Sequence, residues 1–272
     1  MDRYAVFGNP IRQSKSPLIH TQFATQCAEL LSYEAILAPV DGFADSWRAF
    51  VKGGGKGGNV TAPFKQQAYQ LADVLSERAL QAGAVNTLYI DSNGRLHGDN
   101  TDGIGLVADL QRLGVDLPGC AVLLLGAGGA SRGVIGPLLN AGVQQLVLAN
   151  RTQSKAQLIA ESFTNTVYAC GFAEIPNKPY QLVINATSSA LSNERPDINP
   201  SHLQHCLLAY DLSYSSEPTA FMQWSAKHGA LRQADGLGML VSQAAEAFYI
   251  WRGKRPDVTP VLALLQQQLK AR

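Results

Sequence analysis

The sequence is poor in charged residues and has no excess of either sign. Asp, Glu, Lys and Arg make up 16% of its 272 residues, below the ~25% typical of soluble domains. Hydrophobic residues make up 46%, and 22 Lys and Arg against 21 Asp and Glu leave a formal net charge of +1. This composition excludes intrinsic disorder. It also gives no reason to expect nucleic acid or an anionic membrane surface as a partner.

Cysteines and long apolar runs are also scarce. The four cysteines are far apart and form no Cys-x-x-Cys pair (Cys27, Cys120, Cys170 and Cys206), so we expect unpaired thiols and no metal site. No apolar run approaches the ~18 residues that span a bilayer, and the first ten residues lack the apolar region of a signal peptide. We therefore expect a cytoplasmic monomer or homodimer whose ligand is a small molecule.

The length and the pattern of apolar runs predict two α/β domains. At ~150 residues per domain, 272 residues favour two cores. Continuous apolar runs separated by helical patterns are typical of a parallel sheet covered by helices, and they occur at 121–125, 145–149, 167–169, 182–185 and 207–211. A separate α/β unit precedes them, with strands expected at 4–7, 33–37, 59–60 and 87–90.

Two further segments decide how the chain is divided. Residues 53–58 (GGGKGG) hold five glycines in six positions, and we favour a tight turn over a linker. Residues 238–251 carry an apolar stripe at helical spacing, and we expect this helix to pack back on the first domain. The predicted divisions are 1–101, an open-sheet domain at 102–236, and C-terminal helices at 237–272.

A glycine-rich turn follows the strand at 121–125. Gly126, Gly128 and Ser131 occupy the three positions of a dinucleotide fingerprint, with a small residue as the third. In that pattern the first glycine permits the turn and the second lets the backbone approach a pyrophosphate. The helix N-terminus then directs N–H groups at the anion. We therefore expect a Rossmann-like domain in which the cofactor contacts Gly126, Ala127, Gly128, Gly129 and Ala130.

The end of the next strand indicates which dinucleotide is bound. An NAD enzyme usually places Asp or Glu there to hold the ribose hydroxyls, whereas this chain has Asn150, Arg151, Thr152 and Lys155. These donors and cations suit a 2′-phosphate, so the predicted cofactor is NADP. The alternative interpretation is a solvated helix start, although cations in a first helical turn oppose the helix dipole.

Spaced motifs of distinctive composition occur along the whole chain. They are 8–17 (GNPIRQSKSP), 59–65 (NVTAPFK), 83–87 (GAVNT), 98–103 (GDNTDG) and 235–239 (DGLGM) with Gln243. Together they resemble the motifs of the shikimate dehydrogenase family of aromatic biosynthesis. The resemblance implies an N-terminal substrate-binding and catalytic domain, an NADP-binding domain and reversible NADPH-dependent reduction of 3-dehydroshikimate to shikimate. That reaction belongs to chorismate and aromatic amino acid biosynthesis.

The resemblance implies that Lys65 and Asp102 are a catalytic pair that also contacts the substrate. Pro63 is expected at the first position of a helix, which places the Lys65 ammonium against the positive end of the helix dipole. A nearby carboxylate opposes that effect, so such a lysine can exchange a proton. The alternatives are a surface lysine and an N-cap aspartate, since residues 101–103 open a helical run.

The remaining substrate contacts are also implied by the resemblance. Ser14 and Ser16 would hold the substrate carboxylate, although Ser16 before Pro17 is also a plausible helix N-cap. Thr61, Asn86, Tyr214 and Gln243 would contact a ring that carries several hydroxyls. Leu212, where many relatives have methionine, and Gly236 would lie at the nicotinamide, and leucine keeps an apolar wall of similar volume there.

Two rival functions remain open. A quinate/shikimate dehydrogenase that uses NAD would want an acidic residue where Arg151 stands. A non-catalytic NADP-sensing protein on the same scaffold should have lost Lys65 or Asp102, and this sequence retains both.

Overall fold

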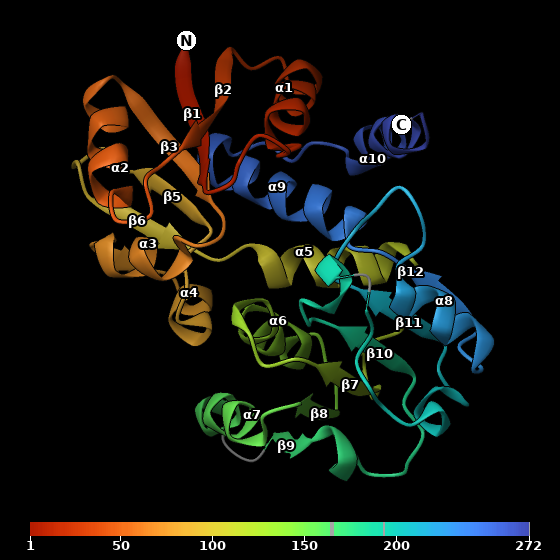
Figure 1. The fold of residues 1–272 in the computed structure, drawn as a ribbon. Helices are drawn as coiled ribbons and strands as arrows, with labels where there is room; N and C mark the ends of the chain where they lie inside the picture. Colours follow the sequence, from red (N-terminus) through yellow and green to blue (C-terminus); the bar gives the residue numbers. More distant parts are fainter. Residues whose placement is uncertain (164–165, 193, 272) are drawn as a thin grey trace. The chain divides into compact units, whose positions relative to one another are not determined.

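The protein consists of two compact α/β units, each with its own six-stranded sheet (Figure 1). The structure is a computed structural model that describes residues 1–163, 166–192 and 194–271. Unit 1 contains Met1–Gly105 and Leu240–Leu265, and unit 2 contains Leu106–Met239 and Gln266–Arg272. The unit boundaries fall inside helices α5 (Asp102–Arg112), α9 (Leu237–Arg252) and α10 (Val258–Lys270), and the first two lie a few residues beyond the expected divisions. Both units are therefore discontinuous in sequence.

The sheet of unit 1 is mixed and has the strand order β2-β1-β3-β5-β6-β4. Strands β2 and β3 run parallel to β1, whereas β5 is antiparallel to both β3 and β6. The strands are β1 (Asp2–Gly8), β2 (Leu31–Leu37), β3 (Gly55–Val60), β4 (Val74–Leu75), β5 (Thr87–Ile90) and β6 (Leu96–Asp99). The helices are α1 (Ser16–Gln26), α2 (Phe43–Lys52), α3 (Lys65–Leu71) and α4 (Glu77–Ala82).

The prediction of a tight turn at 53–58 is confirmed only for residues 53–54 and is wrong for the rest, because strand β3 begins at Gly55. Its glycines are required by close packing. A Cβ on Gly55 would lie 2.2 Å from the Phe50 ring, and one on Gly57 would lie 2.7 Å from the Leu88 carbonyl oxygen. Low strand propensity is thus overridden by the need to bring the neighbouring strand and rings close to the backbone.

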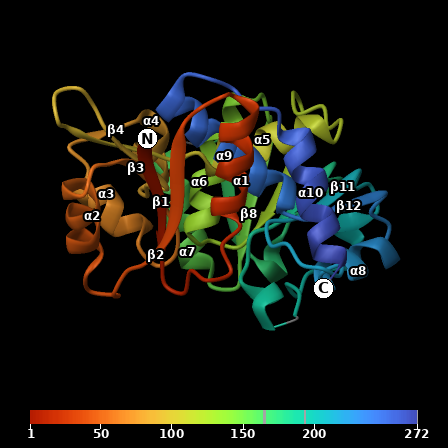
Figure 2. The same ribbon diagram turned by 90° about the horizontal axis from the view of Figure 1, so that it is seen from above.

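Aromatic side chains cover both faces of this sheet. On one face Phe7 makes edge contacts with the rings of Trp47 and Phe50 in α2. On the other face Trp251 of α9 stacks on Tyr4, with ring centroids 4.6 Å apart, and donates a hydrogen bond to the Leu88 carbonyl. Helix α1 packs on β2 (Figures 1 and 2). The C-terminal helix α9 therefore completes the core of unit 1, and α10 (Val258–Lys270) follows it.

The sheet of unit 2 is wholly parallel and has the order β12-β11-β10-β7-β8-β9. This is the strand order of a doubly wound dinucleotide-binding fold, in which the order reverses between β7 and β10. The strands are β7 (Ala121–Leu125), β8 (Gln145–Asn150), β9 (Val167–Gly171), β10 (Leu182–Asn185), β11 (Leu208–Asp211) and β12 (Arg232–Ala234). Helices α6 (Gly129–Asn140), α7 (Gln153–Ala160) and α8 (Ala220–Lys227) alternate with them.

Successive side chains along the strands of unit 2 point to opposite faces of the sheet, so the core has two layers. In β7, Val122 and Leu124 pack with α5, α6 and α7, whereas Leu123 and Leu125 pack on the opposite face with Phe221 of α8. Both faces are buried, as expected for parallel strands covered by helices. The predicted α/β fold with a Rossmann-like second domain is confirmed.

Short 3-10 turns complete the secondary structure at Glu161–Phe163, Phe172–Glu174, Ser189–Ser192 and Pro200–Leu203. Over the residues described, none of the helices combines the length and the apolarity needed to cross a membrane.

Candidate active site

Lys65 and Asp102 form an ion pair in unit 1. The Lys65 ammonium Nζ donates to Oδ2 of Asp102 at 2.6 Å, and both side chains are largely shielded from solvent. Lys65 is the first residue of α3 and Asp102 is the first residue of α5. The expectation that Pro63 begins the helix is wrong, because residues 62–64 form a turn and α3 starts two residues later. Lys65 still lies in the first helical turn.

The second oxygen of Asp102 is held by Asn86. The Asn86 amide Nδ2 donates to Oδ1 of Asp102 at 2.7 Å. On its other side, the Asn86 oxygen Oδ1 accepts from the Thr101 backbone N–H at 2.9 Å and from the Thr87 hydroxyl at 2.8 Å. Because donors occupy the amide oxygen, the amide nitrogen must face the carboxylate. Asn86 therefore fixes the orientation of the carboxylate that pairs with Lys65.

The alternative that Asp102 is only a helix cap is wrong. Helix α5 begins with the Thr101 carbonyl, which accepts from the Gly105 N–H at 2.9 Å. The Asp102 carboxylate is instead engaged by Lys65 and Asn86. Its role is thus independent of the four unpaired N–H groups of the helix.

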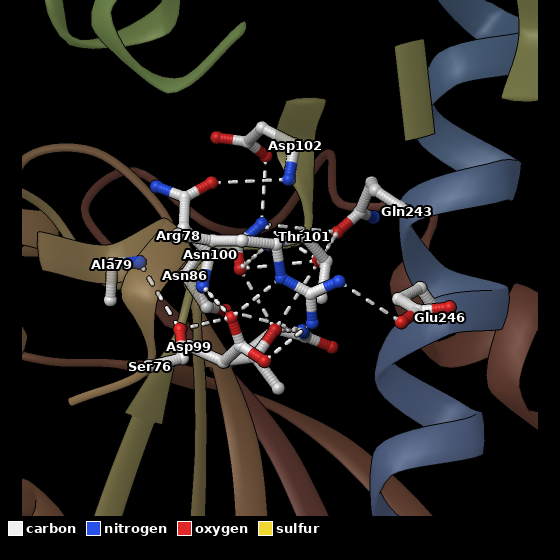
Figure 3. Close-up of polar contacts among 12 residues, drawn as sticks. Ser76, Arg78, Ala79, Asn86, Asp99, Asn100, Thr101, Asp102, Gln243 and Glu246 are labelled. Carbon is white, nitrogen blue, oxygen red and sulfur yellow. Dashed lines mark hydrogen bonds and ion pairs between the residues drawn. The ribbon is translucent and has the colours of Figure 1, made fainter. Parts of the chain in front are cut away.

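Gln243 of α9 joins the same cluster (Figure 3). Its side-chain oxygen accepts from the Thr101 hydroxyl at 3.2 Å and lies 3.4 Å from the Asn86 amide nitrogen. The approach is possible because Gly105 has no side chain, since a Cβ there would lie 2.6 Å from Cβ of Gln243. Four of the predicted site residues, Lys65, Asn86, Asp102 and Gln243, are therefore brought together by direct contacts.

A second charged network lies next to this cluster (Figure 3). Arg78 of α4 donates to both carboxylate oxygens of Asp99, at 3.0 and 2.6 Å, and to Oε1 of Glu246 at 3.2 Å. Burial lowers the pKa of Arg78, but its bonds to Asp99 and Glu246 outweigh burial and leave that pKa above the ordinary value. Sequence reasoning missed this network, because the partners come from three separate segments.

The two predicted carboxylate-binding serines lie at the start of α1. The Ser16 backbone N–H donates to the Ser14 hydroxyl at 3.3 Å. Lys15 occupies the N-cap position and makes no side-chain cap, so the alternative that Ser16 caps the helix is wrong. The Ser16 side chain lies near the Tyr33 hydroxyl, whose pKa is raised by burial. Thr61 follows β3, and its methyl group lies where a side chain on Gly8 would clash.

Tyr33, Asn59 and His20 form a hydrogen-bonded group that reaches Asn86, and sequence reasoning did not assign them a role. The Tyr33 hydroxyl donates to Oδ1 of Asn59 at 2.7 Å, and Nε2 of His20 lies 3.1 Å from the same oxygen. The Asn59 amide nitrogen donates to the Asn86 carbonyl at 3.2 Å. Complete burial lowers the pKa of His20 to about 3, so the imidazole is neutral. Only the polar Asn59 within a buried strand gave a signal.

A cavity of about 1690 Å³ lies in unit 2 at the carboxyl ends of the parallel strands. All nine fingerprint and strand-end residues predicted to bind the cofactor line it: Gly126, Ala127, Gly128, Gly129, Ala130, Asn150, Arg151, Thr152 and Lys155. Gly126 has φ +105, and a Cβ would lie 3.0 Å from the Ala186 carbonyl. Added Cβ atoms at Gly128 and Gly129 would meet nothing within 4 Å. The turn thus leaves open space where a pyrophosphate could approach the α6 N-terminus.

The residues predicted to hold the 2′-phosphate border this cavity. Asn150 accepts from the Ala127 N–H at 3.2 Å and donates to the Thr152 carbonyl at 2.9 Å, so it ties the two loops together. Arg151 and Lys155 are exposed. In residues 1–163, 166–192 and 194–271 neither cation pairs with a carboxylate. The cavity also reaches residues the sequence did not single out, among them Thr187 and Ser189.

Leu212 and Gly236 contact each other, because a Cβ on Gly236 would lie 2.1 Å from the Leu212 carbonyl oxygen. Within the described part of the chain, they are not among the residues that line the cavity. Tyr214 also belongs to unit 2, and burial together with the charge of Asp235 raises the pKa of its hydroxyl.

Family models match three stretches of the chain. Residues 6–88 match the shikimate dehydrogenase substrate binding domain, residues 109–212 match shikimate / quinate 5-dehydrogenase, and residues 236–266 match the shikimate 5'-dehydrogenase C-terminal domain. A shikimate dehydrogenase (NADP(+)) of Chromohalobacter salexigens is 51% identical over 270 residues, which cover 98% of this chain and 99% of that protein.

Solved structures show the same arrangement of elements. An Ael1 enzyme from Pseudomonas putida is 44% identical with a TM-score of 0.94, covering 97% of this chain and 98% of that one. A shikimate 5-dehydrogenase from Thermus thermophilus in complex with NADP(H) and shikimate is 31% identical with a TM-score of 0.88, covering 98% of this chain and 99% of that one.

An α/β unit with a buried Lys–Asp pair and a doubly wound unit with a dinucleotide turn define an oxidoreductase of the nicotinamide-dependent class. The chain belongs to the shikimate dehydrogenase family. The family resemblance seen in the sequence motifs is confirmed.

Proposed function

We propose that this chain catalyses the reversible NADPH-dependent reduction of 3-dehydroshikimate to shikimate. The observation that carries the proposal is the Lys65–Asp102 pair, held at 2.6 Å within the Asn86, Thr101 and Gln243 cluster. The names of the relatives support the substrate and the cofactor.

Lys65 is proposed to give a proton to the ketone oxygen as the alcohol forms, and to take it back in the reverse reaction. Asp102 keeps the ammonium in place and adds negative charge beside it, which stabilises the protonated amine. A positioned group of this kind is worth ~10²–10⁴-fold in rate. Asn86 and Gln243 present an amide nitrogen and oxygen, which suit the hydroxyls of a polyol ring.

Ser14, Ser16, Thr61 and Tyr214 complete the proposed substrate contacts. The two serines suit a carboxylate, because hydroxyl donors lie beside the N–H groups of the first turn of α1. The Tyr214 hydroxyl, whose pKa is raised, stays protonated and can donate. Unit 1, with the α9 segment that bears Gln243, is thus proposed to supply all of the substrate contacts except Tyr214, which belongs to unit 2.

The cavity of unit 2 fits the proposed cofactor NADP. Gly126–Ala130 would face the pyrophosphate, and Arg151, Thr152 and Lys155 would hold the 2′-phosphate. Leu212 and Gly236 are proposed to lie near the nicotinamide. When bound, the reduced cofactor supplies the hydride for the ketone carbon. We include in the proposal a monomer or homodimer in the cytoplasm, without nucleic acid or membrane partners.

The test is absorbance at 340 nm with purified protein, shikimate or quinate, and NADP or NAD. We expect shikimate with NADP to give the highest kcat/KM. A preference for quinate with NAD would favour the related dehydrogenase. NADP binding without turnover of either acid would favour a non-catalytic sensor, although the intact Lys65–Asp102 pair speaks against this alternative.

A further inference from the structure

Arg78 joins two carboxylates that belong to separate segments of unit 1 (Figure 3). Its guanidinium forms a bidentate pair with Asp99 at the end of β6, and its remaining nitrogen reaches Glu246 of α9 at 3.2 Å. The sequence separation between Arg78 and Glu246 is 168 residues. Asp99 and Glu246 are each 8% exposed, so this arginine compensates two charges that are costly to bury alone.

Each carboxylate is connected to a part of the active-site cluster. Oδ1 of Asp99 also accepts from the Ser76 hydroxyl and from the Asn100 N–H at 2.7 Å. The Asn100 side-chain oxygen in turn accepts from the Asp102 N–H at 3.1 Å. The backbone from Asp99 to Asp102 is therefore fixed at its first residue by Arg78.

Glu246 lies three residues after Gln243, one turn further along α9. Because residues three apart share a helix face, the pull of Arg78 on Glu246 draws the same face of α9 towards Thr101 and Asn86. A helix turn held at Glu246 leaves the Gln243 amide little freedom relative to these partners.

We propose that Arg78 is a positioning residue for the reaction: it sets the Asp99–Asp102 segment and the Gln243 turn of α9 relative to each other. This inference rests on the proposed function, since it assigns the order of that site to a residue outside it. Lysine cannot replace it, because a single ammonium lacks the planar fork that serves one carboxylate bidentately while reaching a second.

Arg255 provides a matched control on the same network. It donates to the other oxygen of Glu246 at 2.8 Å and lies over the Tyr249 ring, but it is mostly exposed. In the described part of the chain its only carboxylate partner is Glu246. The Arg255→Ala variant therefore loses one charge near Glu246, while the bidentate pair between Arg78 and Asp99 is retained.

The experiment compares Arg78→Lys, Arg78→Ala and Arg255→Ala with the unsubstituted protein by steady-state kinetics and amide hydrogen exchange. For Arg78→Lys we expect kcat/KM for shikimate to fall ~10²-fold, the cost of a small misplacement at a reacting site. The KM for NADP should change by less than about twofold, because the proposed cofactor residues lie in unit 2. Arg255→Ala should stay near unsubstituted values in both.

Exchange of the Asn100, Thr101 and Asp102 amides should quicken in both Arg78 variants, while the β7 amides Ala121–Leu125 stay unchanged. Guanidinium ion at millimolar concentration should restore turnover to Arg78→Ala, and ammonium ion should not, because only guanidinium supplies the fork.

If exchange at these three amides is unchanged in the Arg78 variants, Arg78 does not position the Asp99–Asp102 segment, whatever the activity. Faster exchange with an unchanged shikimate kcat/KM overturns the role in the reaction. If the unsubstituted protein oxidises no shikimate, the proposed function fails and the role of Arg78 in the reaction fails with it, while the exchange data still decide whether Arg78 orders the segment. If Arg78→Ala does not fold, Arg78→Lys, which keeps the charge, carries the test.

Discussion

The Lys65 ammonium and the Asp102 carboxylate are 37 positions apart in the chain and 2.6 Å apart in space. Lys65 is the first residue of α3, and Asp102 is the first residue of α5. The pair is further fixed by Asn86, which occupies the second carboxylate oxygen. Substitutions can therefore separate the chemistry of these groups from their part in the fold.

Lys65→Ala should lower kcat ~10²–10⁴-fold, because a positioned proton donor is lost. The variant should still fold, since a lysine in a first helical turn opposes the dipole and adds little helix stability, but its melting temperature should fall because Asp102, which is 8% exposed, loses its counter-charge. Stopped assays at saturating shikimate and NADP measure kcat, and Lys56→Ala, an exposed lysine of β3, is the control. Near-normal kcat in a folded Lys65→Ala would assign Lys65 to the surface.

Asp102→Asn tests the carboxylate without changing its shape. Asparagine has the same shape, but its single amide oxygen can accept from only one of the two donors, Lys65 and Asn86, and it lacks the negative charge that favours the ammonium. We expect kcat to fall at least tenfold, with a moderate fall in melting temperature because one buried donor loses its acceptor. Asp116→Asn is the exposed control. An unchanged kcat in Asp102→Asn would contradict a catalytic role of the Lys65–Asp102 pair.

Ser14→Ala and Ser16→Ala should each raise KM for shikimate about tenfold with a smaller effect on kcat. A carboxylate anchor is retained in both the ground state and the transition state, so its loss appears mainly in KM. Thr21→Ala of α1, whose hydroxyl bonds only the Pro17 carbonyl among the described residues, is the control on the same helix. A fall in melting temperature with unchanged KM would point to a purely structural role.

Arg151→Ala should weaken NADP binding and leave NAD binding almost unchanged. Only NADP offers a 2′-phosphate, and a hydrogen bond to a charged group is worth ~1.5–3 kcal/mol. Titration calorimetry with each cofactor measures the two dissociation constants, with Lys270→Ala as an exposed control of equal charge change. If Arg151→Ala weakens the binding of both cofactors equally, Arg151 does not bind the 2′-phosphate, and the interpretation as a solvated helix start is favoured.

The stability of the fold should fall as the pH drops from 8 to 5, in part because of His20. Its pKa is about 3 in the folded protein and ~6.5 when unfolded. The unfolded chain therefore binds a proton in this range that the folded chain does not, which costs about 2 kcal/mol at pH 5. The groups that face the imidazole are Asn59, Tyr33, Phe23, Phe248 and Trp251, and none of them carries a charge at these pH values.

Urea unfolding of His20→Gln at pH 8 and pH 5 measures this contribution. Glutamine can still donate to Asn59 but does not titrate, so the variant should lose about 2 kcal/mol less over the interval. His202, whose pKa burial also lowers, accounts for part of the slope that remains. An exposed histidine, replaced in His205→Gln, serves as the control, and identical slopes in all three proteins contradict the assignment.

Local patterns predicted the second unit well, because its strands are buried on both faces and read as continuous apolar runs. The strand at 121–125 was placed at its observed bounds, and the glycine turn after it lines the cavity as expected. The sequence predicts only residues 59–60 of β3 as a strand, since part of the packing that demands its glycines comes from Leu88 and Trp251, which are far away in sequence.

The site residues were found as motifs, but their contacts were not predictable. Nothing local in the sequence indicates that Tyr33 donates to Asn59, or that Arg78 meets Glu246. These bonds depend on strand order and on the return of α9 to the first sheet. The capping interpretation of Asp102 failed for the same reason, because its carboxylate is engaged by the tertiary partners Lys65 and Asn86. The capping interpretation of Ser16 failed by one residue, since Lys15 is the N-cap of α1.

The discontinuity of unit 1 has a consequence for synthesis of the chain. Domains generally fold as units in the order in which they leave the ribosome. All of the strands of unit 2 emerge before Leu240–Leu265, the segment that brings Trp251 onto the sheet of unit 1 and Gln243 beside Asn86. The sheet of unit 2 can thus form on the nascent chain before residues 1–105 of unit 1 can pack against Leu240–Leu265. A ribosome-bound chain in which Met239 is followed by a linker long enough to span the exit tunnel should resist protease in unit 2 and be cleaved readily in residues 1–105.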